Sequence, residues 1–362
     1  MSWVDINGRF LTQATTGVQR YAREMVRAID RLLQHDPELR DRQQFRLVTP
    51  RGAERTVAAL DHIPRISRGR LSGQLWEQLE LPLYTRHRLV LSLCNTAPLA
   101  ARSVVTIHDA GVFAVPEAYS PAFRLWYRTL IPRLGTRAVQ ILTVSKFSRD
   151  ELSSRGGVPL SKIEVIHPGC EHILEVPSDL GVFARLPVSP GSYLLAVGSR
   201  STHKNLAAVI HAAAALGSAA PPIVTVGSGN TRIFNNPEGV SAPNVHSAGY
   251  ATDAELRALY ENAICLVYPS LYEGFGLPPL EAMVCGCPAI VSNTASLPEV
   301  CGNAVLYCDP EDPTNIARNI TMMQNPCRRE ELRLAGLERA HRFTWRHASE
   351  GLLRTLERVQ AL

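Results

Sequence analysis

Two glutamates at positions 273 and 281 enclose the stretch G-F-G-L-P-P-L. A carboxylate accepts hydrogen bonds strongly, so Glu273 and Glu281 suit the hydroxyls of a sugar or a ribose better than a phosphate. The residues between them predict a glycine-lined loop and a helix that begins near Pro278, where a missing N–H costs nothing. Such a helix start attracts phosphate through its free N–H groups and its dipole. An anion site with a hydroxyl acceptor on each side is what a nucleotide sugar requires.

A second polar stretch, residues 196–206, has the sequence A-V-G-S-R-S-T-H-K-N-L. Its pattern predicts a strand that ends at Gly198 and a loop before the next helix. The basic side chains of this loop are Arg200, His203 and Lys204. A departing diphosphate needs positive charge as the glycosidic bond breaks, and an Arg–Lys pair supplies that charge without a metal ion.

Recognisable metal-binding patterns are missing from the sequence. No D-x-D motif occurs, and the nearest approximation is Asp309-Pro-Glu311. The eight cysteines show no metal-ligand spacing, and we expect them to be reduced. The sequence therefore predicts a site that requires neither a metal nor a cofactor.

In the N-terminal half, two candidate site residues follow predicted strands, at the edge of the expected sheet where a ligand would bind. Residues 104–107 predict a β-branched strand that ends at His108-Asp109, and open α/β sheets bind ligands at the carboxyl ends of their strands. His108 is then either a group that contacts the ligand or a hydrogen-bonded packing residue. Gly17 closes the loop after a first strand and precedes a helix expected over 18–33. It is either a ligand-facing glycine or simply the start of that helix.

The stretch from Glu273 to Glu281 closely resembles the signature of retaining glycosyltransferases of family 4, which have the GT-B fold. The segments T-G-V-Q-R-Y-A-R-E, T-I-H-D and A-V-G-S-R-S-T-H-K-N-L also resemble segments of that family. The resemblance covers almost all of the C-terminal half and discrete segments of the N-terminal half. It implies an α/β fold in which two Rossmann-like βαβ domains face each other across a cleft.

The resemblance also implies roles for individual residues. The expected catalytic residues, which act on the sugar or the leaving diphosphate, are His108, Arg200, Lys204 and Glu273. The expected donor-binding residues are Gly17, Gly198, Gly274, Phe275, Gly276, Leu277 and Glu281, of which the last holds the ribose. Arg200 lies one residue later than the common family pattern, so His203 is an alternative partner for Lys204.

These motifs and the resemblance predict a retaining glycosyltransferase that moves a hexose from a nucleoside diphosphate sugar to a saccharide or lipid-linked saccharide acceptor. The segments G-V-Q-R-Y and R-L-S-G-Q-L-W-E-Q resemble mannosyltransferases of bacterial O-antigen and exopolysaccharide assembly, which implies GDP-mannose as the donor. Two alternatives remain open. One is a UDP-sugar epimerase on the same fold, and the other is a non-catalytic nucleotide-sugar-binding protein.

Length and hydrophobic periodicity predict two domains. The 362 residues are 45% hydrophobic and 20% charged, which is typical of a soluble globular protein. We expect one domain over 1–180 and a second over 190–344, with a proline-rich linker over 175–192. By resemblance, a helix over 345–362 packs back on the first domain. The expected strands are 3–7, 45–49, 89–93, 104–107, 140–144, 163–166, 193–197, 223–226, 245–248, 264–268, 288–292 and 304–308.

The positive charge is concentrated in the N-terminal half. Residues 1–190 hold 25 Lys and Arg against 18 Asp and Glu (net +7), and the remainder holds 13 against 15 (net −2). Arginines interleave with Trp76 and leucines over 65–88, which is either a face that rests on an anionic membrane or a solvated helical face. No run is long enough to span a membrane, and no signal peptide is recognised. We expect a cytoplasmic protein whose partners are the nucleotide sugar and the acceptor, without nucleic acid.

Overall fold

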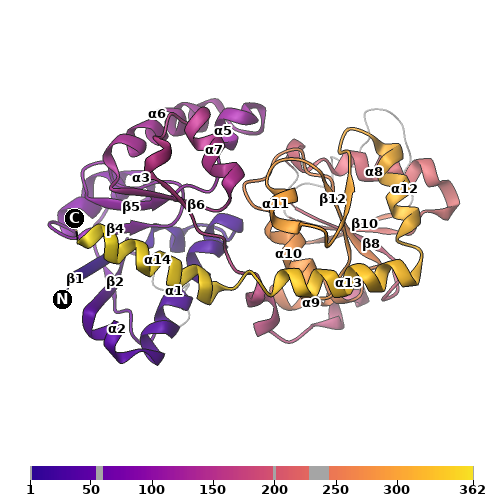
Figure 1. The fold of residues 1–362 in the computed structure, drawn as a ribbon, viewed down its shortest axis with the longest axis horizontal. Coiled ribbons are helices and arrows are strands. Elements are labelled where there is room, and N and C mark those ends of the chain that lie inside the picture. Colours follow the sequence, from indigo (N-terminus) through magenta and orange to yellow (C-terminus); the bar gives the residue numbers. More distant parts are fainter. Residues whose placement is uncertain (1, 54–59, 199–200, 228–243, 362) are drawn as a thin grey trace. The chain divides into compact units, whose positions relative to one another are not determined.

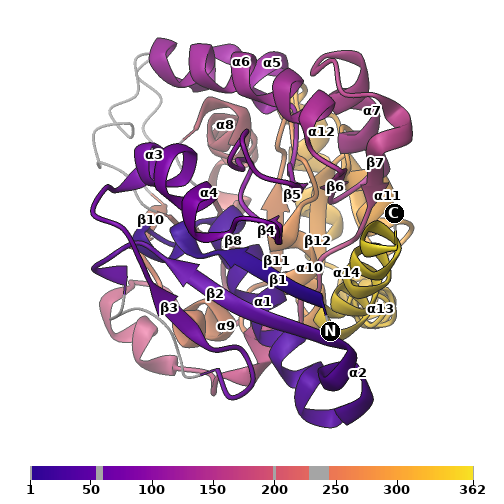
Figure 2. The same ribbon diagram turned by 90° about the vertical axis from the view of Figure 1, so that its left-hand side faces the viewer.

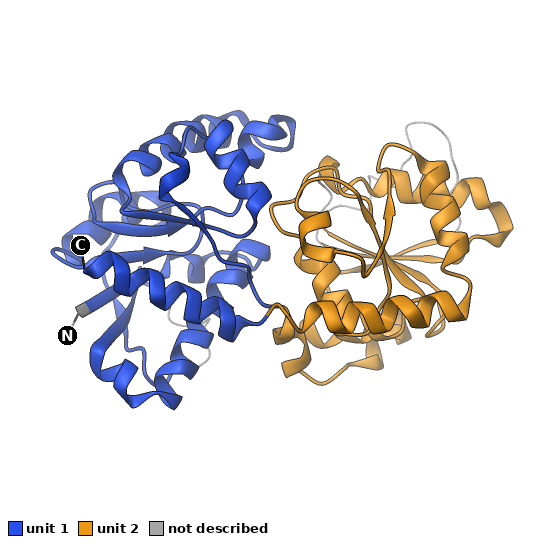
Figure 3. Ribbon diagram, in the orientation of Figure 1, with its two compact units in different colours: residues 1–169, 344–362 blue, residues 170–343 orange. Residues whose placement is uncertain are grey.

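The computed structural model describes residues 2–53, 60–198, 201–227 and 244–361. The chain divides into two compact units, with residues 1–169 and 344–362 in unit 1 and residues 170–343 in unit 2 (Figure 3). The boundary falls between Gly169 and Cys170, earlier than the linker expected from the sequence. The expected linker instead holds 3-10 helices that pack against helix α9 (Asp253–Glu261) of unit 2, which explains why it groups with that unit.

In the described part of unit 1, seven parallel strands form one sheet in the order β3-β2-β1-β4-β5-β6-β7. The strands are β1 Ser2–Asn7, β2 Gln43–Thr49, β3 Arg65–Ser67, β4 Leu89–Ser92, β5 Ser103–Thr106, β6 Gln140–Thr143 and β7 Ile163–Val165. β1 pairs with β2 on one side and with β4 on the other, so the strand order reverses beside it. In doubly wound sheets, ligands bind outside the carboxyl ends of the strands at such a reversal.

Helices cover both faces of this sheet (Figure 1). They are α1 Gly17–His35, α2 Pro37–Arg42, α3 Gly73–Leu75, α4 Leu81–Tyr84, α5 Gly111–Ala114, α6 Pro121–Arg137, α7 Lys146–Ser154 and α14 Trp345–Gln360. A π-helical segment, Trp76–Glu80, joins α3 to α4, and 3-10 helices occupy Gly8–Thr12, Pro116–Ala118 and Leu160–Lys162. The C-terminal helix α14 lies against α1 (Figure 2), where the rings of Tyr21 and Trp345 are 5.8 Å apart between centroids.

In the described part of unit 2, six parallel strands form a sheet in the order β10-β9-β8-β11-β12-β13. The strands are β8 Leu194–Val197, β9 Ile223–Val226, β10 Val245–Gly249, β11 Cys265–Tyr268, β12 Ala289–Ser292 and β13 Leu306–Cys308. All residues of β11 and β12 are buried, as expected for a parallel sheet covered on both faces. Here the order reverses between β8 and β11.

The helices of unit 2 pack on both sides of its sheet. They are α8 Leu206–Leu216, α9 Asp253–Glu261, α10 Leu277–Val284, α11 Leu297–Cys301, α12 Pro313–Met322 and α13 Pro326–Ala340, with 3-10 helices at Glu171–Glu175, Leu180–Arg185, Thr202–Lys204 and Gly217–Ala219. Val209 of α8 and Ile316 of α12 pack with Val267 of β11 in one fully buried cluster. This core holds the carboxyl ends of β8 and β11 in place.

The predicted fold class is confirmed, because both units are α/β layers built on a parallel sheet. Two local differences have simple causes. Residues 8–12, expected as loop, form a 3-10 turn that the Asn7 side chain caps. Helix α10 begins at Leu277, one residue before the proline at which the sequence suggested a start. No helix within the described ranges is both long and apolar enough to cross a membrane.

Candidate active site

The two central strands of the unit 2 sheet bring the predicted polar stretches together. β8 and β11 pair in parallel, with Leu194 opposite Cys265, so the loops after their carboxyl ends emerge side by side. Lys204 ends the 3-10 turn after β8, and Glu273 lies in the loop between β11 and α10. Strand pairing therefore makes neighbours of two residues that are far apart in the sequence.

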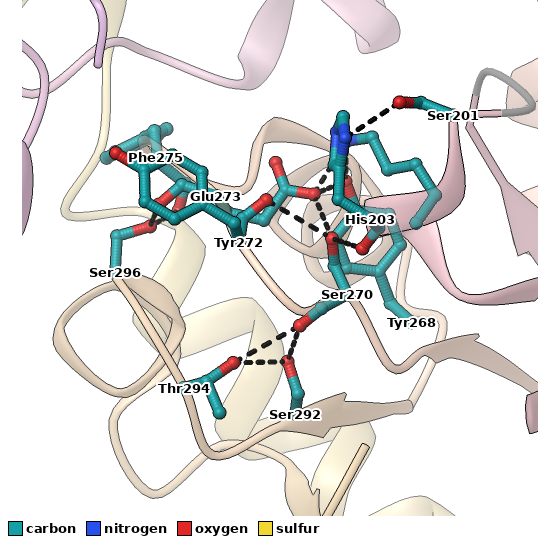
Figure 4. A network of polar contacts seen from close by, with 11 residues as sticks. Ser201, His203, Tyr268, Ser270, Tyr272, Glu273, Phe275, Ser292, Thr294 and Ser296 are labelled. Carbon is teal, nitrogen blue, oxygen red and sulfur yellow. Dashed lines mark hydrogen bonds and ion pairs between the residues drawn. The ribbon is translucent and has the colours of Figure 1, made fainter. Parts of the chain in front are cut away.

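A single oxygen of Glu273 accepts three hydrogen bonds (Figure 4). The donors are Lys204 Nζ at 2.6 Å, Ser270 Oγ at 2.6 Å and the Tyr268 hydroxyl at 2.8 Å from Oε1. Lys204 Nζ also donates to the Tyr268 hydroxyl over 2.7 Å. We call these four residues the Glu273 cluster. No hydrogen bond joins the second oxygen, Oε2, to any residue in the described ranges.

The electrostatics of the cluster keep Glu273 ionised. Its side chain is 11% exposed, and that of Lys204 is 20% exposed. Burial acts to raise the pKa of Glu273, but the Lys204 charge and the hydrogen bonds from its three donors outweigh burial and hold the pKa below its usual value of 4.5. Burial, reinforced by the Glu273 charge, raises the pKa of Tyr268, so its phenol stays protonated and remains a donor. At neutral pH the cluster offers a carboxylate acceptor and an ammonium donor.

Polar side chains that the sequence did not single out fix the loop that carries Glu273. The His203 carbonyl accepts from the Leu271 N–H at 2.7 Å, which ties the loops after β8 and β11 together, and it lies 3.0 Å from Ser270 Oγ, whose single proton is directed to the nearer Glu273. On the other side of this loop, Ser296 Oγ lies 2.9 Å from the carbonyls of both Glu273 and Phe275, which share its single hydroxyl proton (Figure 4). A serine soon after a buried strand can be recognised in the sequence as a candidate site residue, but its hydrogen-bond partners are known only from the fold.

The start of α10 requires glycine at position 276. Gly276 has a φ of 99°, and a Cβ on it would lie 2.5 Å from Leu297 Cδ2. Pro278 and Pro279 occupy the next positions of the first turn and have no N–H. The free N–H groups that this helix start can present are therefore those of Gly276 and Leu277. This helix start therefore offers an anion fewer N–H donors than a helix start without prolines would.

Phe275 and Gly198 serve the site through packing. Phe275 is 6% exposed, and its ring meets the Phe343 ring edge-on at 5.9 Å between centroids. This ring contact anchors the loop between β11 and α10. Gly198 directly follows strand β8, one residue beyond the strand's last residue, and a Cβ on it would lie 3.4 Å from the Lys204 side chain. Both Gly198 and Lys204 line a cavity of about 40 Å³ at the carboxyl ends of β8, β9 and β11.

Glu281 belongs to a different cluster. Its Oε1 lies 3.1 Å from His172 Nε2, and its Oε2 accepts from the Tyr260 hydroxyl at 3.1 Å. The side chains of His172 and Glu281 are 2% and 8% exposed, and Tyr260 is fully buried. We call these three residues the Glu281 cluster. His172 and Tyr260 come from a 3-10 helix and from α9, and no sequence pattern linked them to Glu281.

His108 lies at the carboxyl end of β5 in unit 1, as its motif predicted. Its Nε2 is 3.0 Å from the Leu93 carbonyl, which only accepts, so Nε2 carries the ring proton. Burial lowers the pKa of His108 to about 4, so the ring is neutral at pH 7. Nδ1 then offers a lone pair, which suits a sugar hydroxyl rather than a diphosphate. Gly17 is exposed at the start of α1, and a Cβ added to it would have no atom within 4 Å among the described residues.

The structure thus brings together part of the predicted set. Within unit 2, Gly198, Lys204 and Glu273 are neighbours, while Glu281 lies in its own cluster; His108 and Gly17 belong to unit 1. Arg200 lies outside the described residues. Among the residues that the structure covers, no group of three or more His, Cys, Asp or Glu side chains is placed to hold a metal ion.

Two family comparisons cover most of the chain. Residues 15–172 match the family described as Glycosyltransferase Family 4, and residues 184–338 match Glycosyl transferases group 1. The chain belongs to this glycosyltransferase family. It is accordingly an enzyme of the glycosyltransferase class, as the motifs predicted, and the family match does not favour the epimerase alternative.

Among its relatives, the chain is 34% identical over 261 residues to O-antigen chain mannosyltransferase B of Escherichia coli, with 68% of each chain covered. It is 28% identical over 228 residues to O-antigen chain mannosyltransferase RfbU of Salmonella typhimurium, with 62% of each chain covered. It is 29% identical to the serotype-specific mannosyltransferase WbdA of Escherichia coli, where 72% of this chain matches 34% of that one.

Solved structures of similar fold extend over the whole chain. Sucrose-phosphate synthase from Thermosynechococcus elongatus superposes with a TM-score of 0.75 at 18% identity, covering 100% of both chains. Anabaena HepE, in complex with UDP-glucose, superposes with a TM-score of 0.73 at 18% identity, covering 99% of this chain and 100% of that one. At these identities the superpositions establish the GT-B fold.

Proposed function

We propose that the protein is a retaining mannosyltransferase that transfers mannose from GDP-mannose to a saccharide or lipid-linked saccharide. The names of its relatives support the choice of mannose. The observation that carries the proposal is the Glu273 cluster, in which an ammonium and an ionised carboxylate meet at the carboxyl ends of β8 and β11. Both groups are needed where a sugar hydroxyl must be held beside a departing diphosphate.

Each group of the cluster has a distinct task in this proposal. Glu273 orients the donor sugar by accepting a hydroxyl at Oε2. Lys204 uses two of its three N–H donors on Tyr268 and Glu273 and directs the third to the leaving diphosphate. In unit 1, neutral His108 accepts a hydrogen bond from a sugar hydroxyl, and in unit 2 Glu281 holds the ribose.

The stereochemistry follows from where the proton goes. The acceptor hydroxyl attacks from the face that the diphosphate is leaving, so the configuration at the sugar carbon is retained. A diphosphate oxygen takes the hydroxyl proton as the glycosidic bond breaks, and no protein base is required. The Lys204 charge stabilises the leaving group, which lets the reaction proceed without a metal or a cofactor.

Calorimetric titration of GDP, UDP and ADP into the purified protein, with EDTA present, tests the donor class. The proposal expects tight binding of GDP that Glu281→Ala weakens. Preference for UDP would contradict the GDP-mannose assignment and revive the epimerase. Absence of binding by all three nucleotides would overturn the assignment of a nucleotide-sugar site.

We also propose that unit 1 contacts the anionic inner surface of the cytoplasmic membrane. The support is a stripe of exposed leucines, which we call the leucine stripe: Leu71 (38% exposed), Leu75 (61%), Leu79 (58%) and Leu83 (55%). The segment Trp76–Glu80 is π-helical, with the Leu81 N–H bonded to the Trp76 carbonyl. Leu75, Leu79 and Leu83 lie four residues apart along the continuous helical stretch from α3 to α4, a spacing that keeps side chains near one face.

The backbone of two arginines that precede this segment is hydrogen-bonded to it; the labels α3 and α4 locate the segment in Figure 2. Trp76 Nε1 donates to the Arg68 carbonyl at 2.8 Å, and Glu80 accepts from the backbone N–H of Arg70. Gly69 permits this packing, because a Cβ there would lie 2.2 Å from Glu80 Oε2. Both arginines are exposed, and neither makes an ion pair within the described residues. Leucines flanked by such charges suit an anionic lipid surface, where each charge adds about 1 kcal/mol.

Vesicle co-sedimentation tests this contact. Binding to vesicles that contain phosphatidylglycerol, and not to purely zwitterionic vesicles, is expected for the wild type. Leu75→Ser with Leu79→Ser should abolish it, whereas Leu160→Ser, at a leucine of similar exposure (53%), should not. Equal binding by both variants would refute the contact.

A further inference from the structure

The segment G-V-Q-R-Y places beside the His108 ring a residue that the sequence did not assign to the site. This residue is Tyr21, which lies on α1 and is 3% exposed. Its ring centroid is 4.7 Å from that of His108, and the two ring planes meet at 89°. Gly17, the first residue of the same segment, is exposed. In unit 1, the last residue of the segment is therefore the one that contacts the histidine.

The hydrogen bonds of His108 leave one rotation of its ring only partly restrained. Nε2 donates to the Leu93 carbonyl at 3.0 Å, and the backbone N–H donates to Asn95 at 2.8 Å. Nε2 lies close to the axis of the Cβ–Cγ bond, so a rotation about this axis moves Nδ1 further than it moves Nε2. The χ2 angle of histidine has only a broad, roughly two-fold preference of its own. A further contact is needed to fix the direction of the Nδ1 lone pair.

The Tyr21 ring supplies that contact. Its separation and angle from His108 are those of an edge-to-face aromatic pair, in which the two rings touch. The imidazole cannot turn without displacing Tyr21, and a closely packed interior leaves little room for this. Burial raises the pKa of Tyr21 and lowers that of His108, so both rings are neutral at pH 7. The contact therefore acts through shape rather than through charge.

The C-terminal helix holds Tyr21 in turn. Trp345 is the first residue of α14 and is 4% exposed. Its ring centroid is 5.8 Å from that of Tyr21, with 63° between the planes. Helix α14 lies against α1 (Figure 2). Two segments from opposite ends of the chain thus pack around the residue that contacts His108.

We propose that Tyr21 is a positioning residue for His108. Its ring, packed against Trp345, fixes the plane of the imidazole so that Nδ1 presents its lone pair to a sugar hydroxyl. This inference rests on the proposed function, which assigns His108 a sugar contact. Tyr21 itself touches no substrate in this arrangement. Without its ring, His108 stays at the end of β5, but Nδ1 points in several directions.

Nitrogen NMR of the histidine rings tests the restraint without any substrate. At pH 7, wild-type His108 should show one neutral form, with the proton on Nε2, and His108→Ala identifies its signals. Tyr21→Phe keeps the ring and should preserve this form. Tyr21→Leu should populate both neutral forms, because a turning imidazole loses its bond to Leu93 for part of the time. Trp345→Leu should act in the same direction but less. A single unchanged form in Tyr21→Leu would overturn the proposal.

Release of GDP from GDP-mannose tests whether the restraint serves the reaction. Tyr21→Leu should lower kcat about tenfold, because a contact group that is held less precisely loses rate. Its KM should stay near that of the wild type, and Tyr21→Phe should restore kcat. Phe45→Leu is the matched control, since Phe45 is also a buried aromatic residue of unit 1, 2% exposed on β2. Equal losses of kcat in Tyr21→Leu and Phe45→Leu would refute the positioning role.

A double-mutant cycle shows whether Tyr21 acts through His108. In the His108→Ala background, Tyr21→Leu should have no further effect on kcat, because the group that it positions is gone. The same fold-loss in both backgrounds would overturn the proposal. A wild-type rate in His108→Ala would instead refute the sugar contact of the proposed function, and the NMR result would still decide whether Tyr21 fixes the ring.

Discussion

The two glutamates of one motif lie in unlike surroundings. Glu273, in a loop, receives three hydrogen bonds on one oxygen, one of them from the ammonium of Lys204, and its other oxygen has no hydrogen-bond partner among the described residues. Glu281, one turn into α10, has each oxygen engaged by a buried partner, His172 on one side and Tyr260 on the other. A carboxylate oxygen has two lone pairs, so each oxygen of Glu281 keeps one that the proposed ribose contact would use.

This difference suggests that the Glu273 cluster serves the reaction, whereas the Glu281 cluster stabilises the fold. In the proposed function, the Glu273 cluster places the Lys204–Glu273 ion pair at the bond that breaks, so changes there should affect turnover. The Glu281 cluster ties α10 to α9 and to the Glu171–Glu175 turn, so changes there should affect stability and nucleotide affinity. The experiments below separate these roles, beginning with the largest expected effect.

Replacing Lys204 with alanine should have the largest effect. We expect kcat to fall about 100- to 1,000-fold, because the leaving diphosphate loses its charged donor. Lys162→Ala is the matched control, since Lys162 Nζ donates to the carbonyls of Thr136 and Ala138 in unit 1. Radiolabelled transfer at saturating donor measures the change. Wild-type turnover in Lys204→Ala would refute the catalytic role.

Conversion to glutamine should affect a different quantity at each glutamate: kcat at Glu273 and GDP affinity at Glu281. Glu273→Gln should lower kcat about 100-fold while GDP affinity stays near that of the wild type, because its open oxygen meets the sugar. Glu281→Gln should lower GDP affinity about tenfold, or 1.4 kcal/mol, with a smaller change in kcat. Calorimetry with GDP and initial rates with donor give the two numbers. The same pattern in both variants would remove the distinction between the clusters.

The two tyrosines sharpen the comparison through stability. Tyr260→Phe leaves Glu281 Oε2 without its buried donor and should lower the free energy of unfolding by about 2 kcal/mol. Tyr268→Phe should cost less, because Lys204 and Ser270 still donate to the same Glu273 oxygen. Urea denaturation at pH 7 compares them. A larger loss of stability in Tyr268→Phe would reverse the assignment of the structural cluster.

The pH dependence of stability should reverse where the Lys204 charge is removed. In the wild type, the lowered pKa of Glu273 contributes stability above pH 4.5 that is lost only as pH falls through the lower, folded value. In Lys204→Met, the charge that opposes the effect of burial on Glu273 is gone, so the pKa of Glu273 rises above its value in the unfolded chain. The variant should then gain stability relative to the wild type as pH falls from 7 to 5, by about 1.4 kcal/mol per unit of upward pKa shift. Parallel urea-unfolding curves across this range would contradict the ion pair.

The chain's periodicity was enough to predict most of the fold. Buried parallel strands are continuous apolar runs, so the expected strand over 264–268 differs from β11 by one residue. Short irregular elements were not predictable in the same way. The π-helical turn over Trp76–Glu80 has the residue pattern of an ordinary helix, and only the backbone hydrogen bonds reveal it.

Within the site, the sequence predicted which residues follow strand ends, but not which strands are neighbours. Lys204 and Glu273 were expected in one site by resemblance, and the β8–β11 pairing supplies the physical reason. His172 and Tyr260 escaped prediction, because histidine and tyrosine are common packing residues and neither has a pattern that points to Glu281. The arginine in the loop after β8, Arg200, lies outside the described residues, so its role stays a prediction.

By itself, the sequence determined two α/β domains, the glycosyltransferase signature and the side chains available for chemistry, because these depend on local periodicity and on short motifs. Tertiary structure alone decided that Lys204, Tyr268 and Ser270 converge on one oxygen of Glu273, that Glu281 is held between two buried partners, and that the Tyr21 ring packs against His108. Such contacts depend on strand order and helix packing, which bring distant segments together and which no local pattern encodes.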